Sequence, residues 1–243
     1  MIALFSDFGI TDPYVGLMKM AIYQHAPGCK LVDICHHLPM FNPKASGRLL
    51  QMLVKDLPTG TIILAVVDPG VGTARHPLWL EVDGRHFIGP DNGLFAWLVN
   101  QGTKLEAHIL EYESNKVSAS FHGRDVFAPA AAQIELCKTP ASRSVDAATL
   151  IGREWPAELP EIIHIDHYGN AMTGIDSARV SVDIIFRINE IEFMFQKTFE
   201  NSTKVQPFWY ANSIGLVEFA QFSQSVAGLY NLKVGDKVSL ISS

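Results

Sequence analysis

Residues 61–75 read TIILAVVDPGVGTAR and contain the clearest strand of the chain. Six of the seven residues from Thr61 to Val67 are apolar and many are β-branched. An uninterrupted apolar run of this kind is typical of a strand that is covered on both faces of a sheet. An acid, Asp68, and a glycine-containing loop follow at once. The stretch therefore predicts a buried strand whose carboxyl end opens into a tight turn with a charged side chain.

Strand and helix patterns alternate around this strand over the first half of the chain. Asn42-Pro43 is a typical helix start, and Asp83-Gly84 is a typical turn for a hairpin between residues 76–82 and 85–88. The alternation predicts an α/β fold with a mainly parallel sheet that has helices on both faces. Further strands are expected at residues 2–5 and 30–34, and helices at residues 14–24, 42–55, 94–99 and 125–136.

The sequence pattern changes after Cys137. Residues 138–160 contain three prolines and no long periodicity, which indicates a linker. We therefore expect two domains, an N-terminal α/β domain at residues 1–148 and a small C-terminal all-β barrel at residues 149–243. Short alternating runs predict the strands of the second domain at residues 162–165, 180–185, 191–195, 216–219 and 234–241.

The composition excludes several classes of protein. The net charge of −6 comes without any basic run, so nucleic acid is not an expected partner. No apolar stretch approaches the roughly 18 residues of a membrane span, and the first residues lack the pattern of a signal peptide. Three cysteines without a CxxC pair fit a reducing cytoplasm. Charged residues make up only 18% of the chain, which indicates either a surface partly covered by other subunits or a well-packed α/β protein.

Acidic side chains follow the ends of several predicted strands. Asp7 and Asp68 each begin a tight turn that contains glycine, and Asp91 and Asp166 lie in similar turns. Ligands of open parallel sheets bind beyond the carboxyl ends of the strands. We therefore expect Asp7 and Asp68 to face one crevice, whereas Asp91 is better explained as an ordinary turn residue.

The glycines after Asp68 could belong to a dinucleotide-binding fingerprint, but the spacing excludes it. That fingerprint needs a third glycine where the chain has Arg75, and His76-Pro77 prevents the helix that should follow. The loop instead allows its backbone to approach a ligand closely, and it directs Asp68 and Arg75 to the same region. His122 is a further candidate, because it lies at the predicted N-terminus of a helix, where the dipole disfavours a charged imidazolium.

Metal binding and nucleophilic serine chemistry are weaker alternatives. No HxH, DxD or HExxH spacing is present, Arg75 and Arg124 would lie beside the ion, and there is no GxSxG motif. The acids and histidines that could still supply metal ligands are Asp7, Asp68, Asp91, Asp125, His36, His37 and His122. Aromatic residues in or near the same loops could form a slot for a purine ring, namely Phe41, Phe121, Tyr168, Phe199, Phe208 and Trp209.

Six blocks of sequence, in order along nearly the whole chain, resemble one family. They are residues 6–19 (SDFGITDPYVGLMK), 67–75 (VDPGVGTAR), 89–94 (GPDNGL), 121–131 (FHGRDVFAPAA), 166–170 (DHYGN) and 212–215 (NSIG). Together they resemble the SAM hydroxide adenosyltransferases, which hydrolyse S-adenosyl-L-methionine (SAM) to adenosine and L-methionine and are relatives of the fluorinase and chlorinase enzymes. The resemblance implies an N-terminal α/β domain, a C-terminal β-barrel and a homotrimer in which each active site lies between two subunits.

The resemblance also implies roles for individual residues. Asp68, Arg75 and His122 correspond to the catalytic set of the family, and Asp7 corresponds to its ribose-binding acid. SAM is the substrate, so no cofactor and no metal are expected. Further substrate contacts are expected at Asp12, Tyr14, Phe41, Phe121, Asp166, Asn170, Ser213 and Glu218.

Three positions depart from the family pattern, namely Met20, Ser120 and Ile214. The third leaves open how the carboxylate of the substrate's amino acid is held. The halogenase relatives lack the Asp–Arg–His set that is complete in this chain. We therefore expect no formation of 5′-chloro- or 5′-fluoro-5′-deoxyadenosine.

The expected reaction is a nucleophilic substitution in which water attacks C5′ of the ribose. Asp68 or His122 could act as the base, whereas the guanidinium of Arg75 stays protonated and can only help electrostatically. Asp7 would hold both ribose hydroxyls through its two oxygens. Two other functions remain open at this stage. One is an adenosine- or SAM-binding protein without useful turnover, and the other is a metal-dependent phosphoesterase that uses the acids named above.

Overall fold

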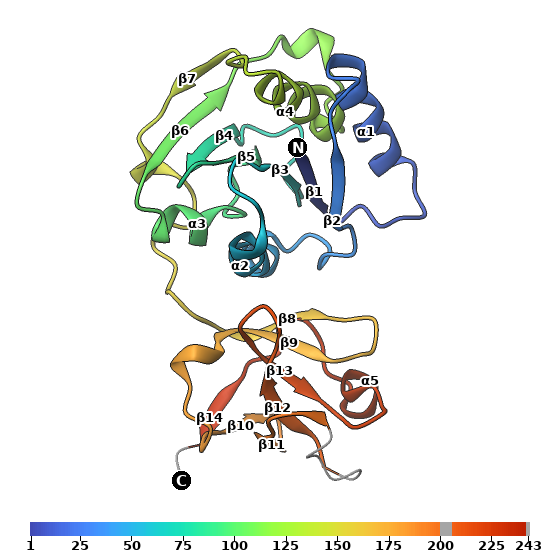
Figure 1. The fold of residues 1–243 in the computed structure, drawn as a ribbon, viewed down its shortest axis with the longest axis vertical. Helices are drawn as coiled ribbons and strands as arrows, with labels where there is room; N and C mark the ends of the chain where they lie inside the picture. The colour runs from blue at the N-terminus through green and yellow to red at the C-terminus, as the bar shows by residue number, and fades with distance from the viewer. Residues whose placement is uncertain (200–205, 242–243) are drawn as a thin grey trace. The chain divides into compact units, whose positions relative to one another are not determined.

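The computed structural model describes residues 1–199 and 206–241, and the chain forms two compact units (Figure 1). The first unit consists of Met1–Gly47 and Asp56–Trp155, and the second of Arg48–Lys55 and Pro156–Ser243. The main passage from one unit to the other therefore follows Trp155. None of the helices in the described ranges is long and apolar enough to cross a membrane.

Seven strands of the described chain form the sheet of the first unit, in the order β2-β1-β3-β5-β4-β6-β7. Neighbours from β2 to β5 are parallel, whereas β4, β6 and β7 pair antiparallel. The sheet is therefore mixed, which corrects the expectation of a mainly parallel sheet. The strands are β1 (Ile2–Ser6), β2 (Leu31–Cys35), β3 (Ile62–Val66), β4 (Pro77–Val82), β5 (Arg85–Pro90), β6 (Leu105–Leu110) and β7 (Ser142–Ser144).

The hairpin of β4 and β5 was predicted, and its turn reverses the chain so that the two strands pair antiparallel. Asp83 and Gly84 both have positive φ, at 48° and 76°, as the tight hairpin turn requires. Strand β3 is buried along its whole length, as its apolar sequence predicted. It lies between β1 and β5 and is parallel to both, so the carboxyl ends of these three strands point the same way.

Helices α1 (Tyr14–His25) and α4 (Ala128–Glu135) pack on one face of this sheet, where their apolar side chains share a core with β1 and β3. On the opposite face, Phe87 of β5 contacts Phe95, which precedes α3 (Ala96–Gln101). The helix predicted at residues 125–136 is divided. A π-helical turn at Gly123–Phe127 precedes α4, since Pro129 has no N–H to continue the ladder.

Helix α2 (Pro43–Leu53) begins at the predicted proline, and the Asn42 side chain accepts a hydrogen bond from the Ala45 N–H at 3.0 Å. The α-helix ends earlier than expected, because Val54–Asp56 form a 3₁₀ turn. The predicted start of this helix is therefore confirmed, whereas the α-helix itself ends at Leu53 and not at the predicted residue 55.

The sheet of the second unit also has seven strands within the described residues, in the order β14-β10-β11-β12-β13-β9-β8. Its neighbours are antiparallel except for β11 and β12. The strands are β8 (Leu159–Ile165), β9 (Ala171–Asp176), β10 (Ile185–Ile188), β11 (Ile191–Phe195), β12 (Phe208–Ala211), β13 (Leu216–Ala220) and β14 (Ser239–Ile241).

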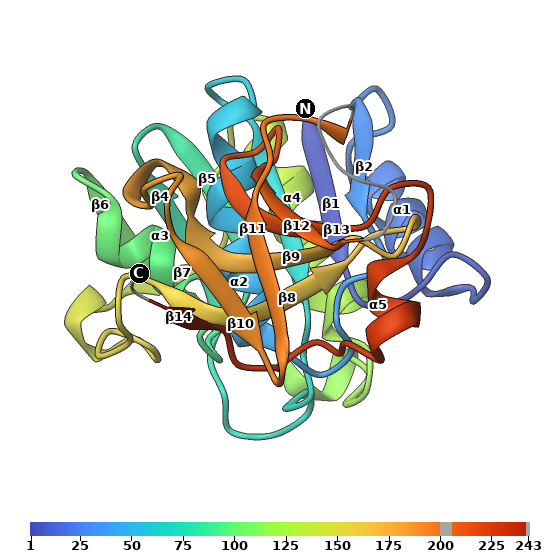
Figure 2. The same cartoon turned by 90° about the horizontal axis from the view of Figure 1, so that it is seen from below.

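This second sheet curls until its two ends approach each other. Just before β14, Asp236 and Val238 exchange backbone hydrogen bonds of 2.9 Å with Ile162 and Pro160 of β8. The unit also contains the helix α5 (Val226–Tyr230), beside the curled strands (Figure 2). Within the described residues this unit is therefore a curled sheet accompanied by α5, and the closed all-β barrel expected from the sequence stays a prediction.

Two strands of the second unit differ from their predicted positions. The apolar residues at 180–184 lie after the 3₁₀ turn Ser177–Arg179, and β10 begins only at Ile185. The Asp183 N–H donates to Ser181 Oγ at 3.3 Å and the Ile184 N–H to the Ser181 carbonyl at 3.1 Å, so local turn bonding replaces strand pairing there. The strand predicted at residues 234–241 is limited to β14.

Candidate active site

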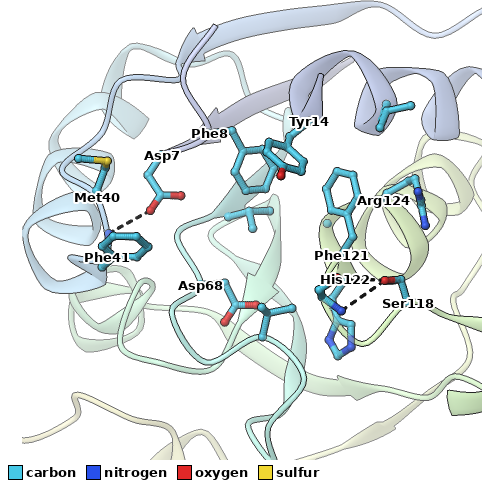
Figure 3. A pocket seen from close by; sticks show the side chains of 15 residues that line it. Asp7, Phe8, Tyr14, Met40, Phe41, Asp68, Ser118, Phe121, His122 and Arg124 are labelled. Atoms are coloured by element: carbon cyan, nitrogen blue, oxygen red, sulfur yellow. Dashed lines mark hydrogen bonds between the residues drawn. The ribbon is translucent and has the colours of Figure 1, made fainter. Parts of the chain in front are cut away.

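The carboxyl ends of β1 and β3 bring Asp7 and Asp68 to one pocket. Ser6 and Val66 are paired in the parallel ladder, and each acid follows its strand within two residues. Both acids line a pocket of about 510 Å³ that is built entirely from the first unit. The single crevice expected from the sequence is therefore present (Figure 3).

Three aromatic rings form a wall of this pocket. The ring centroids of Phe8, Tyr14 and Phe121 lie 5.4–6.0 Å from one another. The Phe121 ring is edge-on to both others, an arrangement that aromatic quadrupoles favour. Figure 3 shows the three rings together beside the two carboxylates. Tyr14 and Phe121 were expected at the site, whereas Phe8 was missed although it directly follows Asp7.

The turn before α2 adds a further contact to Asp7. The Phe41 N–H donates to Asp7 Oδ2 at 3.0 Å, and Phe41 adopts a left-handed φ of 58° that is strained for a side chain of this size. Its ring is 73% exposed at the mouth of the pocket, next to the exposed Met40. Burial raises the pKa of Asp7, the Phe41 N–H partly offsets this, and the charge of Asp68 raises it again. Asp7 therefore lines the pocket with its Oδ2 held by the Phe41 N–H.

Asp68 and Arg75 form a buried, two-pronged ion pair. Arg75 Nε lies 3.0 and 3.1 Å from the two oxygens of Asp68, and Arg75 Nη2 lies 2.5 Å from Oδ2. The side chains are only 7% and 5% exposed. The loop between them depends on Gly72, whose φ is +78° and where a Cβ would lie 2.4 Å from the Ala119 carbonyl oxygen. The loop thus fixes the pair, as the sequence predicted for these two residues.

His122 joins this pair from the start of the π-helical turn. Arg75 Nη2 lies 2.9 Å from His122 Nδ1, and because a guanidinium can only donate, Nδ1 is the acceptor. The neutral ring then carries its hydrogen on Nε2. Burial lowers the pKa of His122, the positive charge of Arg75 lowers it further, and Asp68 and Asp125 act in the opposite direction. Tyr112, which the sequence analysis missed, packs on the ring with centroids 5.4 Å apart.

Two predicted site residues of the first unit, Asp12 and Arg75, do not line the pocket themselves. Arg75 joins the site through its contacts to Asp68 and His122. Asp12 is exposed in the turn before α1 and does not line the pocket, so its role in binding stays a prediction. Asp91 is buried and accepts the Ile151 N–H at 3.1 Å, which agrees with its interpretation as a structural residue.

The other predicted contacts belong to the second unit, and two of them close a local turn. Asp166 accepts hydrogen bonds from the Tyr168 N–H at 2.9 Å and from Asn170, through its N–H at 2.8 Å and its Nδ2 at 3.0 Å. Phe208 and Trp209 of β12 are buried core residues and do not form the open slot expected for a purine.

Glu218 has a supporting role within the second unit. It is only 2% exposed, and its oxygens accept hydrogen bonds from the Tyr210 hydroxyl and, at 2.6 Å, from Asn212 Nδ2. Burial raises its pKa, and these two donors act in the opposite direction. The Asn212 Oδ1 in turn accepts the Ile214 N–H at 3.2 Å across the turn that contains Ser213. Through Asn212, Glu218 therefore supports the Ser213 turn, and its direct contact with a ligand stays a prediction.

The residues proposed as metal ligands do not gather at one point. Within residues 1–199 and 206–241, no three His, Cys, Asp or Glu side chains form a group that could hold a metal ion.

Fold and site together define a class: an α/β protein of two units in which a pocket walled by aromatic rings ends at a buried Asp–Arg–His cluster. Comparisons with known proteins identify it further. The chain belongs to the SAM hydroxide adenosyltransferase family, whose N-terminal domain matches residues 2–143 and whose C-terminal domain matches residues 160–239.

Similar proteins cover this chain almost completely. An (R)-S-adenosyl-L-methionine hydrolase of Thermus thermophilus is 35% identical over 97% of both chains. A protein of the same name from Methanocaldococcus jannaschii is 31% identical over 99% of this chain and 95% of its own. The crystal structure of an uncharacterised conserved protein from Thermotoga maritima superposes with a TM-score of 0.89, at 25% identity and full coverage of both chains.

Proposed function

We propose that this chain hydrolyses (R)-S-adenosyl-L-methionine to adenosine and L-methionine. The observation that carries the proposal is the buried cluster of Asp68, Arg75 and His122 at the pocket that also contains Asp7. The family and the names of the similar proteins supply the substrate. In those names "L" already specifies the configuration at the α-carbon of the amino acid, and "adenosyl" specifies the configuration of the sugar. The descriptor "(R)" therefore refers to the sulfonium sulfur.

The reaction needs a nucleophile rather than a better leaving group. The positive sulfur already makes C5′ of the ribose open to attack, whereas water is a weak nucleophile. A bound water held in line with the C5′–S bond would gain several kcal/mol from orientation alone. As its oxygen bonds to C5′, the C5′–S electron pair moves to sulfur, and neutral methionine thioether leaves.

The hydrogen bonds in the cluster favour Asp68 as the acceptor of the water proton. Arg75 occupies the lone pair of His122 Nδ1, so the neutral imidazole has no lone pair left for a proton. The carboxylate of Asp68 keeps further lone pairs beside those that Arg75 uses. His122 would then donate Nε2–H to the attacking oxygen and stabilise its developing hydroxide character.

Asp7 and the aromatic wall would position the nucleoside. The ionised carboxylate of Asp7 can accept both ribose hydroxyls, and the rings of Tyr14 and Phe121 offer an apolar surface to adenine. Holding the sugar in this way turns C5′ toward Asp68 on the neighbouring strand end.

We further propose a cytoplasmic homotrimer in which each active site lies between two subunits, without a cofactor. The exposed apolar side chains at the mouth of the pocket support the presence of a covering subunit. Phe41, Met40 and Tyr14 are 73%, 72% and 48% exposed. Large exposed apolar groups around a pocket are typical of a surface that another molecule covers. Light scattering after gel filtration should give three times the chain mass, and a monomer of full activity would refute this part.

The activity is tested by incubating purified protein with each sulfonium epimer of SAM and separating the products by chromatography. We expect equimolar adenosine and methionine from the (R) epimer, and no halogenated nucleoside when chloride or fluoride is in excess. Asp68→Asn should lower kcat by about 10²–10⁴-fold, the range for losing a general base. The matched control is Asp56→Asn, an exposed aspartate outside the pocket, which should keep full activity. Tight adenosine binding without hydrolysis would instead identify a binding protein.

A further inference from the structure

A second chain of polar contacts lies behind the pocket, between β1 and β2. Ser6 Oγ lies 2.7 Å from His36 Nδ1, and both side chains are buried. On the other side of the ring, His36 Nε2 lies 3.2 Å from Asp33 Oδ1, although the ring N–H is not aligned for a hydrogen bond. Lys19 Nζ holds the second oxygen of Asp33 at 2.6 Å. The proposed reaction uses none of these groups.

Serine, histidine and aspartate in this order resemble the arrangement of a hydrolytic triad, but burial excludes that use. Ser6 is fully buried, with no exposed surface, so a substrate cannot reach its hydroxyl. A nucleophile needs an accessible oxygen next to its base. These contacts therefore have a structural role, in which they hold the neighbouring segments in place.

These contacts join the two loops that carry Asp7 and Phe41. The Phe8 N–H lies 3.4 Å from Ser6 Oγ, and the Gly9 N–H donates to the His36 carbonyl at 2.7 Å. His36 therefore holds the β1 end through both its side chain and its backbone. The β2 loop then returns to Asp7, where the Phe41 N–H donates to Oδ2 (Figure 3).

The carboxylate of Asp33, 3.2 Å from His36 Nε2, favours the tautomer with its hydrogen on that nitrogen, and this assignment makes His36 the organising group. With its ring hydrogen on Nε2, beside the Asp33 carboxylate, Nδ1 accepts the Ser6 O–H. The oxygen of Ser6 then keeps a lone pair for the Phe8 N–H. Each group in the series is fixed by the one before it, and the series ends at the residue that follows Asp7.

We propose that His36 is a positioning residue that holds Asp7 in the orientation needed to bind the ribose. The proposal rests on the function proposed above, in which Asp7 binds the sugar. A shift of Asp7 by a fraction of an ångström would misalign C5′ and the water, and such misplacement from outside the reacting groups can cost up to about 10²-fold in rate.

The test is a double-mutant cycle between positions 36 and 7 in the full chain. His36→Leu removes the acceptor for Ser6, and we expect it to lower kcat/KM for SAM about tenfold when Asp7 is present. In the Asp7→Asn background the same change should cost less than about twofold, because there is no carboxylate left to position. The melting temperature should fall by the same amount in both backgrounds, since the buried contact is lost in each.

Three companion variants separate positioning from a general loss of structure. His36→Asn, whose side-chain oxygen can replace Nδ1 as acceptor, should recover most of kcat/KM. Ser6→Ala makes the smallest change to the same contact and should reproduce the loss if His36→Leu does not fold. His37→Leu alters the exposed neighbouring histidine and should leave kcat/KM unchanged.

The outcomes distinguish this inference from the proposed function. If the wild type hydrolyses SAM but the two substitutions act independently, the positioning role is wrong and the proposed function stands. If the wild type is inert, the proposed function is wrong. Calorimetric adenosine affinities of the same four proteins then decide whether His36 acts through Asp7: coupling supports the role, and independent effects overturn it.

Discussion

Replacing Arg75 by glutamine should raise the pKa of His122 and lower the stability of the fold. The substitution removes both prongs of the ion pair with Asp68 and the contact of 2.9 Å to His122 Nδ1. The positive charge of Arg75 lowers the pKa of His122, whereas Asp68 raises it. Burial still lowers the pKa of His122 in Arg75→Gln, but the lowering by the Arg75 charge is lost, so the pKa should rise from its wild-type position. In Asp68→Asn the pKa of His122 should instead fall further, so the two variants shift this pKa in opposite directions.

The cost to stability follows from burial. Arg75 and Asp68 are 7% and 5% exposed, and removing one partner of a buried pair costs about 3–5 kcal/mol. In a domain of 150–250 residues each kcal/mol lowers Tm by about 2–4 °C, so Arg75→Gln should melt about 6–20 °C below the wild type. A surface ion pair, by comparison, would contribute about 1 kcal/mol or less.

The assay is a proton NMR titration of the His122 ring in the folded protein, assigned by the loss of its signal in His122→Asn. Calorimetry of the same samples gives Tm. Shifts of the two pKa values in the same direction, or an Arg75→Gln protein as stable as the wild type, would refute the electrostatic account of the cluster.

Three further predictions concern acid, substrate binding and metals. Because the pKa of His122 lies below its ordinary value of 6.5 and the neutral ring is the active form, kcat/KM should be level near neutral pH and should fall only below pH 6.5; a fall that begins at higher pH would contradict this. Asp7→Asn should raise KM. Burial raises the pKa of Asp7, so the ionised carboxylate destabilises the folded protein at pH 7, and the neutral amide of Asp7→Asn should raise Tm there. The difference in Tm from the wild type should shrink as the pH falls toward 4 and Asp7 becomes protonated, as calorimetry can check. EDTA should leave the rate unchanged, and a loss restored by a divalent ion would support a metal enzyme.

The sequence was most informative where function depends on local pattern. The apolar run of β3 and the acid after it predicted both the buried strand and the position of Asp68, because strand direction fixes where the carboxyl end lies. The loop of eight residues from Asp68 to Arg75 predicted that the two side chains lie in the same region, and the structure shows that they form an ion pair. His122 was a candidate from its place at a helix N-terminus, and the family resemblance joined it to Asp68 and Arg75. Its contact to the Arg75 guanidinium, 47 positions along the chain, comes from the structure.

What the sequence could not supply were properties set by distant packing. Glu218 reads as one more available acid, and only the fold shows that Tyr210 and Asn212 occupy its oxygens. The position of Phe8 directly after Asp7 was a usable signal, whereas nothing in the sequence near Tyr112 indicates that it packs against His122. The predicted hairpin of β4 and β5 already makes the sheet mixed, whereas the antiparallel addition of β6 next to β4 is a long-range choice that hydrophobic periodicity does not encode.

The most direct test of the central claim is product analysis by mass spectrometry after hydrolysis of SAM in oxygen-18 water. Attack of a held water at C5′ predicts one labelled oxygen in adenosine and none in methionine. Unlabelled adenosine, or methylthioadenosine in its place, would contradict a water positioned by Asp68, Arg75 and His122 at C5′.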